Sequence, residues 1–351
     1  MQQWWTGLAN VPPTDASALH ALGLGFMAAR TLAVALELRL FTHLAGTESS
    51  LTQIASTLGL AERAAARLLY ACAALGLVRV STGGCRNTPL AETYLVEGRP
   101  TFIGGYLQMF DTLGYHRWEQ MRTALQHNAP VDALYHPYHD LAEDTSAARA
   151  FHTAQHAGSL SLGHALARHI DFRPFHCLLD LGGGSGAYTI EILRRYPHLE
   201  AIVFDLPEVC RIAEEALRQA RLAEQTHTMA GDYERDPLPS GPDVVLWSGN
   251  LHASSPTRCA QVLRKVFALL PPGGTLLIHD YLLDDTRTGP LIPALLALHL
   301  TLVSEDGQVY SGAEVCTLLA QAGFAGVSVQ PFLVGHSSLV IAQVGSTVRQ
   351  P

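Results

Sequence analysis

The segment LLDLGGGSG, residues 178–186, decides the fold of this chain. It joins an apolar run that starts at Cys177 to an amphipathic stretch over 187–196, and this order predicts a strand, a tight turn and a helix. Glycines let the backbone turn sharply and approach a ligand at distances where a Cβ atom would clash. The turn also presents free N–H groups and the positive end of a helix. We therefore expect an anionic or carboxylate-bearing cofactor at this turn.

A second strand end indicates which part of a cofactor is held. The run AIVFD, residues 201–205, is apolar and ends in Asp205, and a carboxylate at this position accepts hydrogen bonds from both hydroxyls of a ribose. The glycine spacing departs from the dinucleotide pattern G-x-G-x-x-G. Counting from Gly182 puts Ala187 at the third glycine, which that pattern tolerates, whereas counting from Gly184 puts Thr189 there, which it does not. A glycine turn that only connects a strand to a helix is the alternative.

Length and composition narrow the class of protein. The chain has 351 residues, enough for two domains, and its 48% hydrophobic and 15% charged residues describe a soluble globular protein with a large core. A net charge of −8 argues against a nucleic-acid partner. The six cysteines are scattered without a CxxC pair, as expected of reduced cysteines in a cytoplasmic protein. We expect no signal peptide, because the first residues, MQQWW, offer neither a basic region nor a long apolar run. We expect no membrane partner, because no uninterrupted apolar stretch reaches about 18 residues.

The N-terminal third predicts a helical module that pairs with a second copy. Apolar residues recur at helical spacing over 15–45, and the stretches 22–27 and 33–36 are too apolar for solvent. Burial against a second subunit, giving a homodimer, is the natural interpretation. Short helices from Ser50 and over 61–75, followed by a hairpin around Gly83, then follow the winged-helix pattern.

A winged helix often binds DNA, and this alternative is disfavoured by charge. Residues 1–100 contain seven arginines, no lysine and six acidic residues. A nearly neutral wing attracts phosphates poorly.

Beyond Cys177, apolar runs alternate with helical stretches, which predicts a Rossmann-like, parallel, doubly wound α/β sheet. The expected strands are 177–181, 201–205, 226–230, 243–247 and 275–279, the expected helices are 187–196, 208–222, 256–270 and 312–322, and a terminal hairpin joins 327–331 to 338–343. We therefore expect a winged-helix dimerisation domain over 1–105, connecting helices that line a substrate pocket over 106–170, and a cofactor-binding domain over 171–351.

These motifs together resemble the class I S-adenosylmethionine-dependent O-methyltransferases of the caffeate and acetylserotonin type, including their bacterial secondary-metabolism branch. The resemblance covers nearly the whole chain and is carried by LLDLGGGSGAYTIEILRRYP, FDLPEV, GDY at 231–233, DVVLWSGNLH, LRKVFALLPPGGTLLIHDYLL and LLAQAGF. It implies a homodimeric enzyme that transfers a methyl group to a hydroxyl oxygen of a small aromatic or enol metabolite. A dehydrogenase is disfavoured by the glycine spacing and by the GDY strand end.

The resemblance also implies which residues hold S-adenosylmethionine. It implies that Gly182 and Gly184 meet the methionine part of the cofactor and that Asp205 and Leu206 hold the ribose. It further implies that Asp232 and Tyr233 bind the adenine, with Ser248 near that ring.

His252 occupies the position of the family's general base, and a histidine near neutral pKa can take a phenol or enol proton. A structural histidine after a strand is the alternative. Asp280 matches the first of the two acids that flank the base in relatives. The second acid and its neighbouring arginine are replaced by Val309 and Tyr310, and Ala253 follows the histidine in place of an aspartate. A base without the second acid is expected to be less well oriented.

The expected acceptor pocket contains several histidines, which keep two other reactions open. Its residues are Phe110, Trp118, His152, Gln155, His156 and His299. In a C-methyltransferase acting on the β-carbon of an α-keto acid, His252 and His299 would hold a divalent or trivalent metal that stabilises the enolate. A non-methylating pericyclic or decarboxylating enzyme that retains the cofactor is the other alternative.

Overall fold

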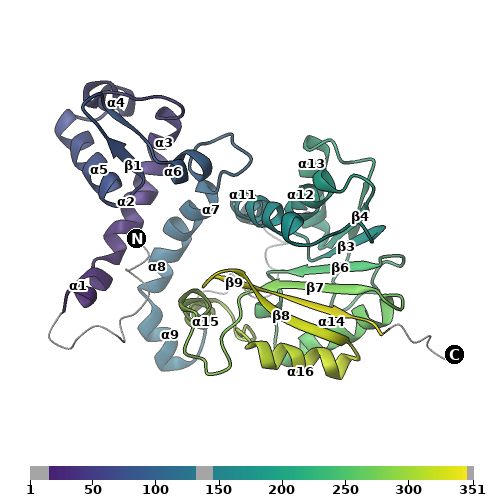
Figure 1. Cartoon of the computed structure of the whole chain (residues 1–351). Coiled ribbons are helices and arrows are strands. Elements are labelled where there is room, and N and C mark those ends of the chain that lie inside the picture. The colour runs from purple at the N-terminus through teal and green to yellow at the C-terminus, as the bar shows by residue number, and fades with distance from the viewer. Residues whose placement is uncertain (1–15, 132–144, 346–351) are drawn as a thin grey trace. The chain divides into compact units, whose positions relative to one another are not determined.

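The computed structural model describes residues 16–131 and 145–345, which form two compact units divided between Tyr115 and His116 (Figure 1). The connecting segment expected over 106–170 is thus shared between the two units. We describe each unit by itself.

The first unit begins with three helices, α1 (Ser17–Gly23), α2 (Gly25–Glu37) and α3 (Leu40–His43). The helical structure expected over 15–45 is present, but it is divided into these three helices. The chain bends by 42° between α1 and α2, and Arg39, with φ at 57°, separates α2 from α3. A left-handed residue cannot continue a right-handed helix, so the apolar periodicity runs across breaks that it does not reveal.

The α1–α2 pair presents apolar side chains to solvent in the single chain. Five large ones are between 46% and 64% exposed, namely Leu19, Leu22, Leu24, Phe26 and Met27. Among the described residues, no single helix is long and apolar enough to span a membrane. The bent α1–α2 pair reaches that length and composition only when its two helices are taken together.

The winged-helix prediction is confirmed. Helix α4 (Leu51–Leu58) starts in a capping box between Ser50 and Gln53, and α5 (Glu62–Ala74) leads into the antiparallel strands β1 (Val78–Val80) and β2 (Cys85–Asn87). Helices α6 (Pro89–Tyr94) and α7 (Gly104–Met109) and a π-helical turn over Phe110–Gly114 complete this unit. Its core gathers apolar side chains from α2 to α6, including Leu36, Phe41, Leu69 and Leu95.

The second unit contains the predicted sheet, with seven strands in the order β5-β4-β3-β6-β7-β9-β8. The strands are β3 (Cys177–Leu181), β4 (Glu200–Asp205), β5 (Thr226–Ala230), β6 (Val244–Ser248), β7 (Thr275–Asp280), β8 (Ala325–Leu333) and β9 (Ser337–Gln343). Strands β3 to β7 run parallel, and β9 pairs antiparallel with both β7 and β8. The strand order reverses between β3 and β6, and ligands of such sheets bind beyond the carboxyl ends of the strands at this reversal.

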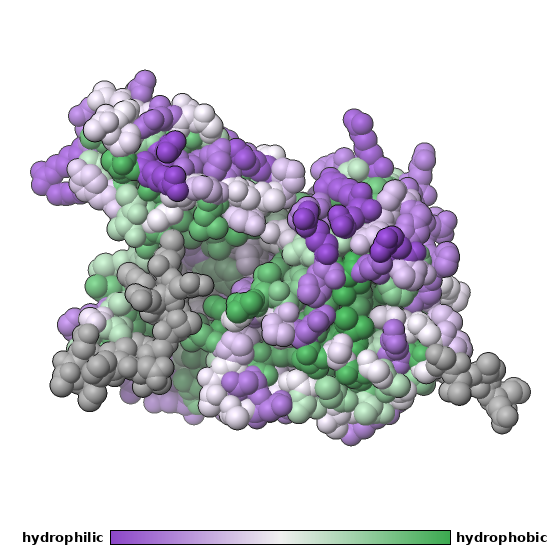
Figure 2. Space-filling view, in the orientation of Figure 1, coloured by the Kyte–Doolittle hydropathy of each residue, from purple (hydrophilic) through white to green (hydrophobic). Residues whose placement is uncertain are grey.

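Helices cover both faces of the sheet (Figure 1). Helices α11 (Thr145–His169), α12 (Ala187–Arg195) and α13 (Pro207–Gln219) lie on one face, and α14 (Pro256–Leu269) and α16 (Gly312–Ala322) lie on the other. Polar side chains gather over the outer face of α13 (Figure 2). The short α8 (Tyr115–Trp118), with α9 (Met121–His127) and α15 (Leu291–Val303), brings further side chains to this unit.

Candidate active site

The loop between β3 and α12 passes so close to other groups that only glycine fits. Gly182 and Gly184 have φ of +65° and +57°, a conformation that favours glycine. A Cβ atom on Gly182 would lie 2.7 Å from the Asn250 amide nitrogen and 3.1 Å from the Tyr233 ring. The loop therefore forms a narrow cradle whose wall includes an aromatic ring.

Asp205 ends β4 beside this cradle, and its carboxylate is held by backbone. Oδ2 accepts the Gly184 N–H at 2.8 Å, and Oδ1 accepts the Leu206 N–H at 2.7 Å. The residue is only 8% exposed. Burial raises the pKa of Asp205 to about 6, although the two backbone hydrogen bonds oppose that shift. Its oxygens keep further lone pairs, so it can still accept from a pair of hydroxyls.

Asp232 and Tyr233 follow β5 and lie at the same edge of the sheet. Asp232 Oδ1 accepts the Glu234 N–H at 2.9 Å, and its side chain is 18% exposed. The Tyr233 ring meets Trp247 edge to face, with 6.2 Å between centroids. Lys265 fixes this turn, because its Nζ donates to the Tyr233 carbonyl at 2.7 Å.

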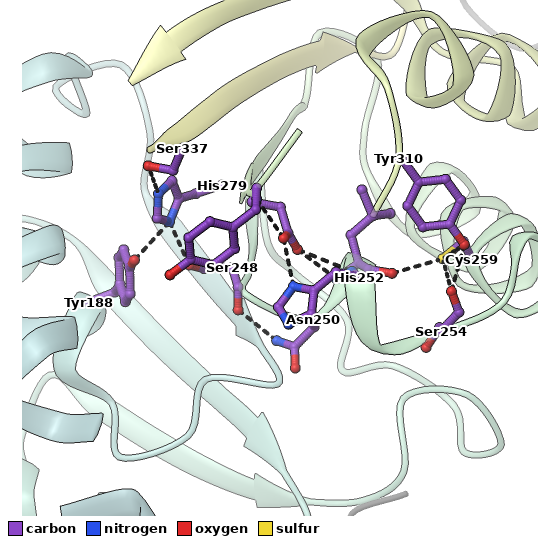
Figure 3. Close-up of polar contacts among 12 residues, drawn as sticks. Tyr188, Ser248, Asn250, His252, Ser254, Cys259, His279, Tyr310 and Ser337 are labelled. Atoms are coloured by element: carbon purple, nitrogen blue, oxygen red, sulfur yellow. Dashed lines mark hydrogen bonds and ion pairs between the residues drawn. The ribbon is translucent and has the colours of Figure 1, made fainter. Parts of the chain in front are cut away.

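Ser248, at the end of β6, belongs to a buried hydroxyl cluster around His279 (Figure 3). His279 Nδ1 lies 2.8 Å from the Tyr188 hydroxyl and 3.1 Å from Ser248 Oγ, and Nε2 lies 2.9 Å from Ser337 Oγ. Burial lowers the pKa of His279 to about 4, so the ring is neutral. The hydroxyl of Ser248, which we expected near an adenine, hydrogen-bonds the neutral His279.

His252 lies on a 3-10 turn, Leu251–Ala253, just beyond β6. Its Nδ1 donates to Asp280 Oδ1 at 2.7 Å, and Asp280 lies at the end of β7. Asp280 also accepts the N–H groups of Leu251 at 2.9 Å and of Tyr281 at 2.7 Å. One carboxylate thus holds both the imidazole and the turn that carries it.

The charge balance of this pair suits a base. Burial disfavours the imidazolium, but the charge of Asp280 and its hydrogen bond outweigh burial, so the pKa of His252 is raised from 6.5. The nearby His252 holds the pKa of Asp280 below its ordinary value despite burial. The His252 side chain is 12% exposed and that of Asp280 is 1% exposed, so the pair is oriented and largely shielded from water.

The segment around Val309, where the resemblance led us to expect a second acid, contacts the turn that carries His252. The Gln308 N–H donates to the His252 carbonyl at 2.9 Å. The Tyr310 hydroxyl donates to the Ser254 carbonyl at 2.6 Å and lies 3.5 Å from the Cys259 sulfur (Figure 3). Val309 is 2% exposed within an apolar cluster. Sequence reasoning noted Tyr310 only as a departure and missed its contact with the turn.

Trp118 and His299, both expected in the acceptor pocket, lie together. The indole N–H donates to His299 Nδ1 at 3.2 Å, and the rings stack with centroids 6.3 Å apart at 12°. Burial lowers the pKa of His299, and the charges of Arg117 and His252 lower it further. His299 is therefore a neutral ring within the electrostatic reach of His252.

In the part of the chain that the structure describes, no metal site is found around the two expected metal ligands. His252 and His299 direct their Nδ1 atoms to Asp280 and Trp118. Across 16–131 and 145–345, no group of three or more His, Cys, Asp or Glu side chains is arranged to hold a metal ion.

The two histidines of α11 lie against the glycine loop. His152 is 5% exposed, and its Nδ1 is 3.6 Å from the position of a Cβ atom on Gly184. His156 Nδ1 lies 2.7 Å from Ser185 Oγ. Gln155 is half-buried on the same helix, whereas Phe110 belongs to the first unit.

Two further polar residues support the loop and were missed by sequence reasoning. Asn250 Nδ2 donates to the carbonyls of Gly182 at 3.1 Å and of Ser248 at 2.8 Å. Thr189 Oγ1 donates to the buried Asp180 at 2.7 Å. The sequence feature that could have identified Asn250 is its position between the end of a strand and His252.

Comparisons with known proteins show which family this chain resembles. Residues 122–325 match the family model of the O-methyltransferase domain, and residues 21–97 match that of the O-methyltransferase dimerisation domain. The chain is 36% identical to 3-hydroxy-5-methyl-1-naphthoate 3-O-methyltransferase of Streptomyces sahachiroi, over 93% of this chain and 94% of that protein. It is 32% identical to the tetracenomycin polyketide synthesis 8-O-methyltransferase of Streptomyces glaucescens, over 87% and 90% of the two chains.

Among solved structures, human N-acetylserotonin methyltransferase in complex with S-adenosylmethionine matches with a TM-score of 0.82 at 26% identity, covering 95% of this chain and 100% of that one. The two family models, the identity over most of the chain and the shared fold lead to one conclusion. The chain belongs to the family of S-adenosylmethionine-dependent O-methyltransferases.

Proposed function

We propose that this enzyme methylates a hydroxyl on an aromatic ring of a secondary metabolite, with His252 as the base. The observation that carries the proposal is the buried His252–Asp280 pair, because an imidazole fixed through Nδ1 presents Nε2 to an acceptor. The 36% identical naphthoate O-methyltransferase supports an aromatic acceptor.

The residues at the glycine loop fit S-adenosylmethionine. Gly182 lets the loop pass close to Asn250 and Tyr233, where a Cβ atom would clash, and the backbone-held carboxylate of Asp205 suits the ribose hydroxyls, with Leu206 beside it. We propose that Asp232 accepts from the adenine amino group and that the Tyr233 ring, beside the loop, offers the adenine an apolar face. Bound there, the cofactor supplies an electrophilic methyl group on sulfur.

The chain's own part in the reaction is proton transfer and orientation. His252 takes the hydroxyl proton at Nε2, and Asp280 stabilises the imidazolium that forms. Because Val309 stands in place of a second acid, Tyr310 and Gln308 hold the turn through the carbonyls of Ser254 and His252. Trp118 and the neutral His299 are proposed to line the acceptor's side of the site.

Product analysis tests this function. Purified protein is incubated with S-adenosylmethionine and a panel of hydroxynaphthoates and phenols, and mass spectrometry identifies products that gain one methyl group. His252→Ala is expected to lower turnover by about 10²–10⁴-fold and to leave cofactor affinity unchanged. His127→Ala, at an exposed site on α9, is the control. Full turnover in His252→Ala, or a product of unchanged mass, would contradict the proposal.

We also propose that the enzyme is a homodimer through the first unit. The match to a dimerisation domain supports this, as do the exposed apolar side chains of α1 and α2. Burying them against a second copy removes apolar surface from water, at about 25 cal/mol per Å².

A further inference from the structure

We propose that Tyr281 is a positioning residue for the base, and that its ring fixes the plane of the His252 imidazole, which the hydrogen bond to Asp280 alone does not fix. This inference rests on the proposed function, because it concerns how His252 is held for the proton transfer. The sequence analysis assigned no role to Tyr281.

A single hydrogen bond leaves the imidazole free to tilt. The contact of His252 Nδ1 with Asp280 Oδ1, at 2.7 Å, fixes where that nitrogen lies. The torsion that turns a histidine ring is broad, because it joins an sp³ carbon to an sp² carbon, so the plane of the ring can still change about this contact. The resemblance led us to expect a second acid near the base, but Val309 stands there. The plane of the imidazole therefore needs another contact.

The Tyr281 ring supplies a contact of that kind. It meets the His252 ring nearly edge to face, with 5.8 Å between the centroids and 77° between the planes. Pairs of rings in this arrangement attract each other, and the attraction depends on the angle between them. A tilt of the imidazole would press the two rings together on one side and separate them on the other. The contact therefore resists the motion that the hydrogen bond to Asp280 permits.

Tyr281 is itself held at its backbone and at its ring. Its N–H donates at 2.7 Å to Asp280 Oδ1, the same oxygen that accepts from His252. On the other side, its ring packs against His336, with centroids 5.1 Å apart and 52° between the planes. His336 directly precedes β9, which pairs with β7. The ring is thus anchored to two neighbouring strands of the sheet, and it can hold the imidazole without rearranging first.

The contact acts on the orientation of the base and leaves its proton affinity to other groups. Burial lowers the pKa of His252, and the charge of Asp280 with its hydrogen bond raises it. His299, which also interacts electrostatically with His252, has a lowered pKa and is neutral at neutral pH. A substitution that keeps the bulk of Tyr281 but removes its ring leaves each of these causes in place. It should therefore lower the rate without moving the pH at which the base becomes active.

The test is a double-mutant cycle on methyl transfer to a hydroxynaphthoate or phenol that the product screen shows to be methylated. Tyr281→Leu removes the ring, and the matched control Tyr281→Phe removes only the hydroxyl. We expect Tyr281→Leu to lower kcat about tenfold, with KM and the rising limb of the pH profile unchanged, and Tyr281→Phe to stay within about twofold of the native kcat. In a His252→Ala background, Tyr281→Leu should cause no further loss, because no imidazole remains to be oriented.

Calorimetry with S-adenosylhomocysteine checks that each variant is folded, and Tyr281→Met, with a flexible side chain, replaces Tyr281→Leu if the leucine variant does not bind it. A native kcat in Tyr281→Leu, equal losses in the two backgrounds, or an equal loss in Tyr281→Phe would overturn the positioning role. A raised KM with native kcat would overturn it too, because the ring would then act on acceptor binding. Full turnover in His252→Ala alone would instead refute the proposed base.

Discussion

Replacing Asp280 by asparagine tests the reasoning about the base most directly. Oδ1 accepts from His252 Nδ1 and the Tyr281 N–H, and Oδ2 accepts from the Leu251 N–H at 2.9 Å and, more weakly, the His252 N–H at 3.4 Å. Asparagine offers one acceptor oxygen, so whichever way its amide turns, an NH₂ group faces N–H donors. Either the imidazole or the turn then loses its partner.

The expected loss of kcat follows from the number of hydrogen bonds that the substitution breaks. An unpaired buried donor costs about 1–3 kcal/mol, and about 1.4 kcal/mol corresponds to a tenfold change in rate. Two such losses, or one combined with a misaligned imidazole, predict that Asp280→Asn lowers kcat about 10²-fold. The cofactor's Kd should change little, because Asp280 lies at the end of β7 and not in the glycine loop.

The dependence of activity on pH shows in which direction the substitution shifts the pKa of His252. A base works only when unprotonated, so activity rises with pH through the pKa of His252, which Asp280 raises above 6.5. Without that charge, burial dominates and lowers the pKa, so the rising limb should move to lower pH. The ratio of native to variant kcat should therefore be largest on the alkaline plateau and shrink as pH falls.

The assay is steady-state methyl transfer between about pH 5 and 9, with calorimetry for the cofactor. Asp284→Asn, at an exposed acid four residues further on, is the matched control and should keep the native profile. If the rising limb of the pH profile of Asp280→Asn keeps its native pH while the plateau falls, then Asp280 does not set the pKa of His252.

Three further predictions address other parts of the molecule. Asp205→Ala should weaken S-adenosylmethionine binding by about 1–3 kcal/mol. The affinity of the native protein should also fall at pH values below the Asp205 pKa of about 6, where the carboxylate is protonated. If calorimetry finds neither effect, the assignment of Asp205 to the ribose is wrong. Tyr310→Phe leaves the Ser254 carbonyl without its 2.6 Å donor, so kcat should fall up to about tenfold with cofactor affinity retained, and an unchanged kcat would make the contact purely structural. Phe26→Asp on the exposed face of α2 should shift sedimentation from dimer to monomer, whereas a native protein already monomeric at micromolar concentration would contradict the dimer.

The sequence alone determined the architecture of the second unit. Strands expected at 177–181 and 226–230 and a helix at 312–322 occur with those bounds, because hydrophobic period, glycines and capping residues act within a few positions of one another. The glycine loop and the acid that ends β4 were predictable for the same reason. By contrast, the helix expected over 15–45 is broken at Arg39, where one left-handed residue interrupts an otherwise continuous apolar pattern.

Only the tertiary structure decided which side chains meet. Trp118 contacts His299 across 181 positions, and Ser248 contacts His279 because β6 and β7 are neighbours in register. His152 reaches Gly184 because α11 packs on α12 at that face of the sheet. Local pattern fixes where a residue stands on its own helix or strand, but the direction of its side chain relative to a distant element depends on packing, which no short stretch of sequence encodes.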